Sequence, residues 1–268
     1  MDMVTICAAL QAELAALDTI VRPLDEAGWN TQTPAEGWLV RDQIAHIGGT
    51  DRVATIAAGE PERFQNHILT QDRSTRAARQ HQEVAHLSGA ELLDWWRSGR
   101  EAMLQVFLPL DPKARIPWFG PAMSAVSFAT ARLMETWAHG QDIVDALGLQ
   151  RDATERLQHV AHIGVRARPF SYSVHQKDMP DEDIRIELAS PAGHLWTWGD
   201  AQVANRISGA ALDFCLVVTQ RRHTADTRLR IEGAAAAEWM SIAQAFAGPA
   251  GAGRQPGQFP KSSWGVSG

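Results

Sequence analysis

The sequence predicts a helical bundle followed by a small α+β domain, and three observations support this fold class. The chain has 268 residues, which is too many for one small core and suits two domains of ordinary size. Before Arg151, apolar residues recur with helical spacing in long stretches separated by proline and glycine. After Arg151, segments with the alternation of strands appear. We expect a four-helix bundle over residues 1–150, an α+β domain over 151–250 and a flexible tail over 251–268.

The bundle helices are expected at residues 4–27, 40–58, 88–107 and 122–147. Breakers interrupt the apolar pattern at their ends, as Gly28 does after the first. Ser88 and Glu91 form the capping-box pattern that begins a helix. The helix at 122–147 is apolar on most faces, which favours the middle of a bundle. The polar stretch 63–82 is expected to hold a short helix inside a long connection.

The second domain is expected to combine short helices with a small sheet. Ile184 to Leu188 alternates apolar and charged residues, and the turn Pro191-Ala192-Gly193 follows it. The expected elements are a helix at 153–170, strands at 184–188 and 195–198, a helix at 203–219, a strand at 227–231 and a helix at 234–246.

Charge and composition argue against several classes of partner. The formal net charge of −6 and the absence of a clustered cationic patch argue against nucleic acid. The N-terminus lacks a basic segment followed by an apolar core, and no membrane span is expected, so we expect a cytoplasmic protein. Cys7 and Cys215 both lie in apolar helical patterns, which is typical of buried thiols in a reducing compartment. The sequence leaves the oligomeric state open.

A polar cluster on the fourth helix is the first candidate for chemistry. Glu135, His139 and Asp142 stand at i, i+4 and i+7, which places them on one face within roughly a 60° sector. The same stripe continues through apolar and small residues, so the cluster is expected to be buried. A buried carboxylate beside an imidazole needs a partner that offsets its desolvation, and a divalent cation does this well.

His46 on the second helix can supply a further ligand. Gly49, one turn later, is expected to leave room beside it for a ligand or a water. Two imidazoles and one carboxylate would leave a tetrahedral zinc ion with one open position, as in catalytic sites. Asp142 would then complete the catalytic set by accepting the other ring N–H of His139 or His46, which fixes the tautomer.

Spacing alone leaves a plainer interpretation open. Glu135 with His139, and Asp42 with His46, are also the i,i+4 pairs that form on solvated helix faces. Nothing in the spacing shows that His46 lies near His139. The remaining histidines are interpreted as surface or core residues, including His81, His86, His159 and His162.

Two motifs resemble a known family. The segment GWLVRDQIAHI (residues 37–47) resembles the W-x-V-R-D-x-x-A-H-L stretch of the DinB-like, mycothiol-dependent maleylpyruvate isomerase family, and ETWAHGQD (residues 135–142) resembles its E-x-W-x-H-x-x-D stretch. In that family the first His, the Glu and the second His bind a divalent metal, usually zinc, in a four-helix bundle. The resemblance therefore implies that His46, Glu135 and His139 are metal ligands.

The second domain resembles the family only loosely. VVTQRR (residues 217–222), followed by the expected strand RLRIEG (residues 228–233), is similar to the G-R then V-x-G pattern that ends family members. There an arginine reaches toward the active site, and Arg221 or Arg222 would be the catalytic match. Gln220 stands where the family often has glycine, which leaves the register open. Arginines at a helix C-terminus are also favoured by the helix dipole alone.

The resemblance implies a thiol-dependent reaction on a small electrophile. A thiol bound to the metal loses its proton and becomes a strong nucleophile. In the family's isomerisation the thiolate of mycothiol adds to an activated double bond, the resulting single bond rotates and the thiol is eliminated. The same site could stop after addition, as an S-transferase.

Other functions remain open at this point. An activated water in the same position would make a hydrolase or lyase. Two His and one carboxylate also form the facial triad of iron(II) oxygenases, although those ligands normally lie on a β-barrel. The chain could also be a non-catalytic, metal-stabilised ligand-binding protein.

Overall fold

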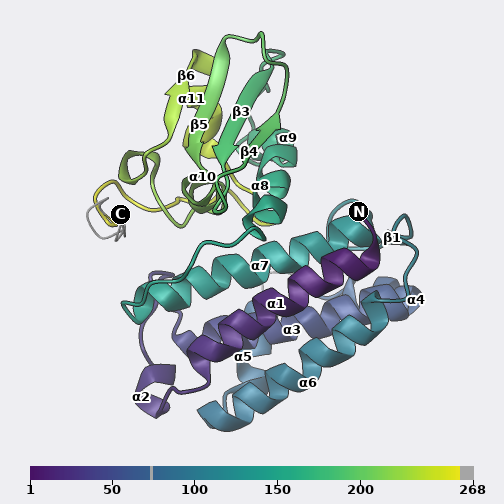
Figure 1. Ribbon diagram of the computed structural model, residues 1–268. Coiled ribbons are helices and arrows are strands. Elements are labelled where there is room, and N and C mark those ends of the chain that lie inside the picture. The colour runs from purple at the N-terminus through teal and green to yellow at the C-terminus, as the bar shows by residue number, and fades with distance from the viewer. Residues whose placement is uncertain (73–74, 260–268) are drawn as a thin grey trace. The chain divides into compact units, whose positions relative to one another are not determined.

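The computed structural model describes residues 1–72 and 75–259, and it divides into two compact units. The first unit is Met1–Arg151 and the second is Asp152–Gly268. Each unit has its own buried core, and Figure 1 shows helices in the first and a sheet with helices in the second.

Four long helices form a bundle in the described part of the first unit (Figure 1). They are α1 (Met3–Val21), α3 (Val40–Gly59), α6 (Gly89–Phe107) and α7 (Ala125–Ala146). Helix α3 contacts both α6 and α7, and α1 contacts α7 and α6. Their shared core includes the fully buried Leu10, Ile44, Trp96, Phe107 and Phe128. The predicted fold class is confirmed.

The first helix is shorter than expected. It was predicted to run over residues 4–27, but α1 ends at Val21, and a separate short helix α2 (Glu26–Trp29) follows. Pro23 lies between them, and proline cannot continue a helix because it lacks the N–H and clashes with the carbonyl one turn earlier. Asp25 then begins α2 by accepting a hydrogen bond from the Gly28 N–H at 2.9 Å.

Helix α1 is long and apolar enough, by length and composition alone, to cross a membrane, which the sequence analysis did not expect. In the structure it is a bundle helix, and it buries Glu13 and Asp18 on the side that packs. The Asp18 carboxylate lies 2.8 Å from Arg97 Nε and 2.7 Å from Arg100 Nη2. A buried carboxylate paired with two guanidiniums of α6 fits a helix held in a protein core.

The connections hold short elements that were not fully predicted. Between α3 and α6 lie α4 (Pro61–Arg63), the π-helix η1 (Phe64–Ile68) and α5 (Arg76–Val84). Strands β1 (Arg115–Ile116) and β2 (Met123–Ser124) form a small antiparallel pair before α7. Helix α7 therefore begins at Ala125 instead of Ala122, with the Ser124 hydroxyl accepting from the Ser127 N–H.

The second unit contains a four-stranded sheet in the order β4-β3-β5-β6. The strands are β3 (Ile184–Ala189), β4 (Leu195–Trp198), β5 (Asn205–Ala210) and β6 (Arg230–Glu232). Strands β3 and β5 are parallel, and the other pairs are antiparallel. The helices of this unit are α8 (Leu157–Arg166), α9 (Arg168–Val174), α10 (Ala211–Val218), the 3-10 turn η2 (Thr224–Asp226) and α11 (Ala234–Ile242).

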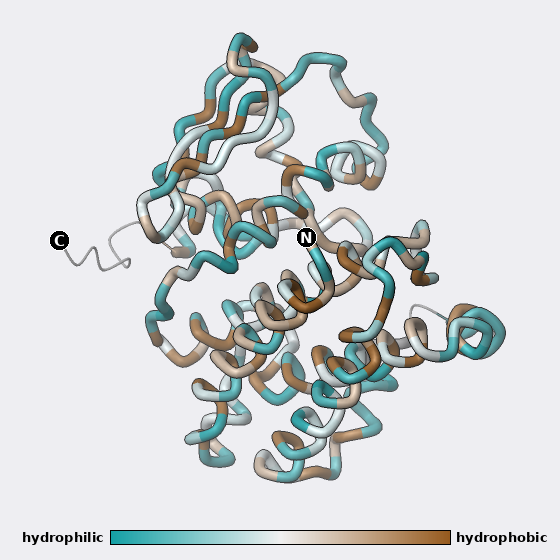
Figure 2. The backbone as a smooth tube through the Cα atoms, turned by 45° about the vertical axis from the view of Figure 1, so that its right-hand side comes forward, coloured by the Kyte–Doolittle hydropathy of each residue, from teal (hydrophilic) through white to brown (hydrophobic). Residues whose placement is uncertain are grey.

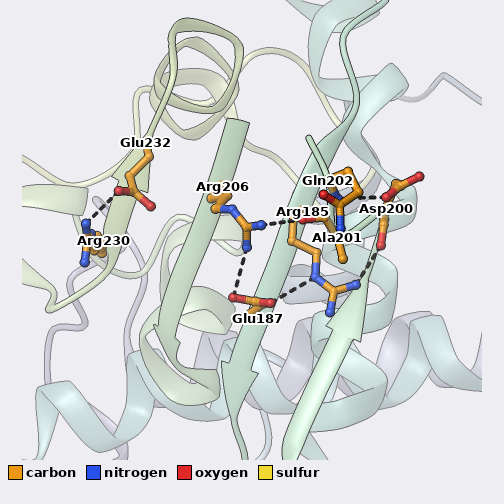
Figure 3. Close-up of polar contacts among 9 residues, drawn as sticks. Arg185, Glu187, Asp200, Ala201, Gln202, Arg206, Arg230 and Glu232 are labelled. Atoms are coloured by element: carbon orange, nitrogen blue, oxygen red, sulfur yellow. Dashed lines mark hydrogen bonds and ion pairs between the residues drawn. The ribbon is translucent and has the colours of Figure 1, made fainter. Parts of the chain in front are cut away.

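Alternation along β3 separates the two faces of this sheet. Ile184, Ile186 and Leu188 are buried, whereas Arg185 and Glu187 are half-buried on the other face. Hydrophobic and hydrophilic residues alternate along the strands, as the brown and teal segments in Figure 2 show. The Glu187 carboxylate accepts from Arg185 Nε at 3.1 Å and from Arg206 Nη1 of the neighbouring strand at 3.4 Å, as Figure 3 shows.

The helix predicted at 203–219 is wrong in its first half. Residues 205–210 form β5, which pairs Ile207 with Ile186 of β3, and only 211–218 are helical. The stabilising partner of β5 is far away in sequence, so helical spacing was a misleading local signal. The helix predicted at 153–170 is instead divided into α8 and α9 near Pro169. Of the predicted tail, residues 260–268 lie outside the described residues.

Replacing the cap of α6 should weaken the bundle. The Ser88 hydroxyl accepts from the Glu91 N–H at 3.3 Å, and the Glu91 carboxylate accepts from the Ser88 N–H at 2.8 Å. We expect Ser88→Ala to lower the free energy of unfolding by about 1 kcal/mol in urea denaturation. Ser98→Ala, on an exposed position inside α6, is the matched control and should cause no loss. Equal effects would contradict the capping role.

Candidate metal centre

The bundle brings together the three predicted metal ligands. Glu135 and His139 lie one turn apart on α7, and His46 lies on α3, which packs against α7. One potential ligand atom from each residue lies within 4.8 Å of the other two. The two imidazole ring centres are 4.7 Å apart. Two helices of the bundle thus place two nitrogens and a carboxylate oxygen around one point.

The arrangement fits a small divalent cation. His139 Nε2 and Glu135 Oε2 are 3.4 Å apart. Two ligands at the usual zinc distances on a tetrahedral ion lie about 3.3 Å apart. In addition, the Nδ1 atom of His46 is buried and has no hydrogen-bond partner. A buried imidazole nitrogen without a partner is costly, and a cation would provide one.

The electrostatics of the site keep these groups in their metal-binding forms. Burial, with a contribution from the neighbouring His139, lowers the pKa of His46 to about 3. Burial opposes ionisation of Glu135, but the hydrogen bond from His139 and the nearby Arg132 and His46 outweigh it and lower its pKa to about 2. Near neutral pH, His46 is neutral and Glu135 is ionised, as metal binding requires.

Trp38 packs beside the imidazoles from the loop that precedes α3. Its ring centre lies 5.2 Å from that of His46, 4.8 Å from His81 and 6.0 Å from His139. The loop reaches this position through a turn in which Gly37 has φ +75°, a conformation that favours glycine. His81 was interpreted as a surface or core residue, but α5 places it against Trp38, with its Nδ1 3.7 Å from Asp42. The residues around His81 in the sequence show no pattern that would predict its contact with Trp38.

The hydrogen-bond partner of His139 is Gln43, which the sequence analysis did not identify. His139 Nδ1 and Gln43 Oε1 are 2.6 Å apart, and Gln43 is fully buried one turn before His46 on α3. The analogous role was predicted for Asp142, which is buried one turn beyond His139 on α7. That role remains a prediction. Gln43 lies inside the motif at residues 37–47, one turn before His46 on the same helix. This spacing was the one sequence signal that could have placed it near the ligands.

The space expected beside Gly49 is filled. A Cβ atom at Gly49 would lie 2.9 Å from the side chain of Gln80, so α5 packs here in place of a ligand. Gly49 and Gln80 also take part in lining a cavity of about 450 Å³. Its lining includes Gly49, Arg52, Ile68, Arg79 and Gln80.

The two candidate arginines are buried in the second unit, after α10. Arg221 Nη1 donates to the Thr219 carbonyl, and Arg222 Nη1 to the Arg221 carbonyl. Gln220 has φ +60°, the conformation that glycine adopts most readily. This favours the register in which Gln220 takes the glycine place and Arg221 matches the family arginine. The catalytic role of Arg221 or Arg222 remains a prediction.

Comparisons with known proteins agree with the two motifs. The family model of the mycothiol maleylpyruvate isomerase N-terminal domain matches residues 10–144. Two uncharacterized proteins from strains of Mycobacterium tuberculosis are 44% identical over 261 residues, covering 92% of this chain and 97% of theirs. The crystal structures of a mycothiol-dependent maleylpyruvate isomerase and of its histidine-to-alanine mutant match with a TM-score of 0.59. They cover 83% of this chain and 90% of theirs at 14% and 12% identity, which shows the fold.

A buried ion pair beside the site gives a testable prediction. Arg132 Nε donates to Asp51 Oδ1 at 2.9 Å, and both side chains are almost fully buried. Removing one partner strands the other charge, so Asp51→Leu and Arg132→Met should each cost about 3–5 kcal/mol in urea denaturation. The double variant should lose much less than the sum of the two. Additive losses would show that the charges do not depend on each other.

Proposed function

Because this chain belongs to the mycothiol maleylpyruvate isomerase family, we propose that it is a divalent-metal-dependent enzyme that uses a low-molecular-weight thiol of the mycothiol type. Its reaction would be isomerisation of a small electrophile, or transfer of the thiol to it. Zinc is the favoured ion. The observation that carries the proposal is the convergence of His46, Glu135 and His139 between α3 and α7.

The thiol must come from outside the chain. Cys7 and Cys215 are both buried, and burial raises the pKa of each thiol. A buried thiol with a raised pKa is a poor nucleophile near neutral pH. A divalent cation, when bound, would favour the thiolate form of a small thiol that reaches the same centre. This division of roles suits an enzyme that binds its nucleophile as a cofactor.

The proposed isomerisation needs only the thiolate and the substrate, because the thiolate that adds is released again. The thiolate forms a C–S bond to a carbon–carbon double bond conjugated with a carbonyl group, and the electron pair moves toward the carbonyl oxygen. Rotation about the new single bond, followed by cleavage of the C–S bond, restores the double bond and the thiolate. In transfer, the adduct takes up a proton and leaves with the thiol attached.

The chain's own residues would hold the reacting groups. His46, Glu135 and His139 would bind the ion, and Trp38 would cover the imidazoles on one side. The cavity lined by Gly49 also has Arg52, Arg79 and Glu83 in its lining, and the Arg52 guanidinium donates to the Trp95 carbonyl at 2.9 Å.

Metal content tests the proposed site directly. We expect protein purified without chelator to hold a stoichiometric divalent ion, and His139→Ala to lose most of it because one of three ligands is gone. His162→Ala, which removes an exposed imidazole of the second unit, is the matched control and should retain the metal. Equal metal content in wild type and His139→Ala, measured by elemental analysis, would remove the basis of the proposal.

Thiol dependence separates the proposed reaction from one that uses water. Turnover of maleylpyruvate, or release of a thiol adduct from a related electrophile, should require mycothiol and should fall to background without it. A variant with Cys7→Ala and Cys215→Ala should behave as wild type, because neither thiol supplies the nucleophile. Turnover that is equally fast without added thiol would favour a hydrolase or lyase.

A further inference from the structure

We propose that a three-group hydrogen-bond relay, formed by the Gln43 side chain, the Thr33 hydroxyl and the Trp38 carbonyl, fixes the tautomer of His139 and so directs its Nε2 lone pair to the metal. The effect of this relay on metal binding rests on the proposed function. The relay itself is a property of the metal-free chain. Gln43 and Thr33 are therefore positioning residues that act through a ligand.

The relay connects the loop before α3 to the face of α7 that carries the ligands. Its links are 2.6 Å between His139 Nδ1 and Gln43 Oε1, 3.0 Å between Gln43 Nε2 and Thr33 Oγ1, and 2.7 Å between Thr33 Oγ1 and the Trp38 carbonyl oxygen. Gln43 is fully buried and Thr33 is 4% exposed. Water therefore competes little with these bonds, and each acts in a medium where it is electrostatically strong.

The polarity of the relay follows from its last member. A main-chain carbonyl only accepts, so the single proton of the Thr33 hydroxyl is directed to Trp38 and the hydroxyl oxygen accepts from Gln43. The amide nitrogen of Gln43 must then face Thr33, and its oxygen must face His139. An amide oxygen only accepts, so His139 must carry its proton on Nδ1. In the neutral imidazole, which is the form that binds a metal, Nε2 is then left with a lone pair, and its nearest carboxylate oxygen among the three ligands is Glu135 Oε2 at 3.4 Å.

Trp38 contacts the relay at both of its ends, Thr33 and His139. Its carbonyl terminates the relay, and its indole stacks on the His139 ring with an angle of 15° between the planes. The loop is itself closed by the Thr33 N–H, which donates to the same carbonyl at 2.9 Å. One residue thus fixes the orientation of the His139 ring from its face and its protonation pattern through hydrogen bonds. Partners of this kind are generally worth 10–100-fold in metal affinity.

The tautomer can be observed in the metal-free protein. In chelator-treated protein with 15N-labelled histidine, ring NMR should show His139 protonated at Nδ1, with the signal assigned by its loss in His139→Ala. Thr33→Val removes the hydroxyl, frees the amide to turn over and should give a mixture of tautomers. Thr33→Ser should restore the wild-type state. A wild-type His139 that carries its proton on Nε2 and none on Nδ1, or an unchanged tautomer in Thr33→Val, would overturn the relay.

Metal affinity tests the consequence. In competition titrations with a chromophoric chelator and zinc, Gln43→Leu should bind about 10–100-fold more weakly than wild type. Gln43→Glu keeps an acceptor for Nδ1 and should retain most of the affinity. Gln141→Leu is the matched control, because it removes a buried amide of α7 that donates to Asp145 instead of an imidazole. Equal affinity in Gln43→Leu and Gln141→Leu would overturn the positioning role.

The two experiments distinguish the relay from the proposed function. If wild type holds no metal but His139 carries its proton on Nδ1, the metal proposal fails and the relay stands. If wild type binds metal and the tautomer or affinity is insensitive to Gln43 and Thr33, the relay fails and the metal proposal stands.

Discussion

The contact between α3 and α7 is the constraint on which the rest of the first unit depends. It buries polar groups that would be costly alone, and it pairs several of them: His139 has Gln43, and Arg132 has Asp51. The Nδ1 atom of His46 is buried without a hydrogen-bond partner next to Glu135 and His139. Other buried polar atoms of this unit also lack a hydrogen-bond partner, among them Trp96 Nε1 and Gln141 Oε1, but His46 is the one that lies beside two further potential metal ligands.

Local signals were sufficient for the bundle and insufficient for the sheet. Helices such as α6 carry their own periodicity and their own cap at Ser88, so they can be predicted without knowledge of their neighbours. Strand β5 is stabilised by parallel pairing with β3, and this long-range contact overrides the helical spacing of its residues. The end of α1 was a different failure, because Pro23 was a visible local signal that the apolar pattern obscured.

The candidate site shows the same division between local and distant information. The spacing of Glu135 and His139 placed them on one helix face, and His46 was a further candidate, but spacing could not show that His46 lies near them, whereas the family motifs implied it. Trp38 and Gln43 lie within one of these motifs, yet their roles depend on how the preceding loop folds against α7. His81 reaches Trp38 through the packing of α5, which no residue pattern in its own segment encodes.

The placement of Arg132 explains how Glu135 stays available. Arg132 lies three residues before Glu135 on α7, the spacing at which a guanidinium and a carboxylate commonly pair on a helix. Such a pair would occupy the oxygen that a cation needs. Asp51 on α3 instead accepts from Arg132 Nε at 2.9 Å and lies 2.8 Å from its Nη2. The guanidinium is thus held by another carboxylate, while its charge still helps to keep Glu135 ionised. Asp51 therefore pairs with Arg132, and Glu135 stays available to bind a cation. One carboxylate could not do both.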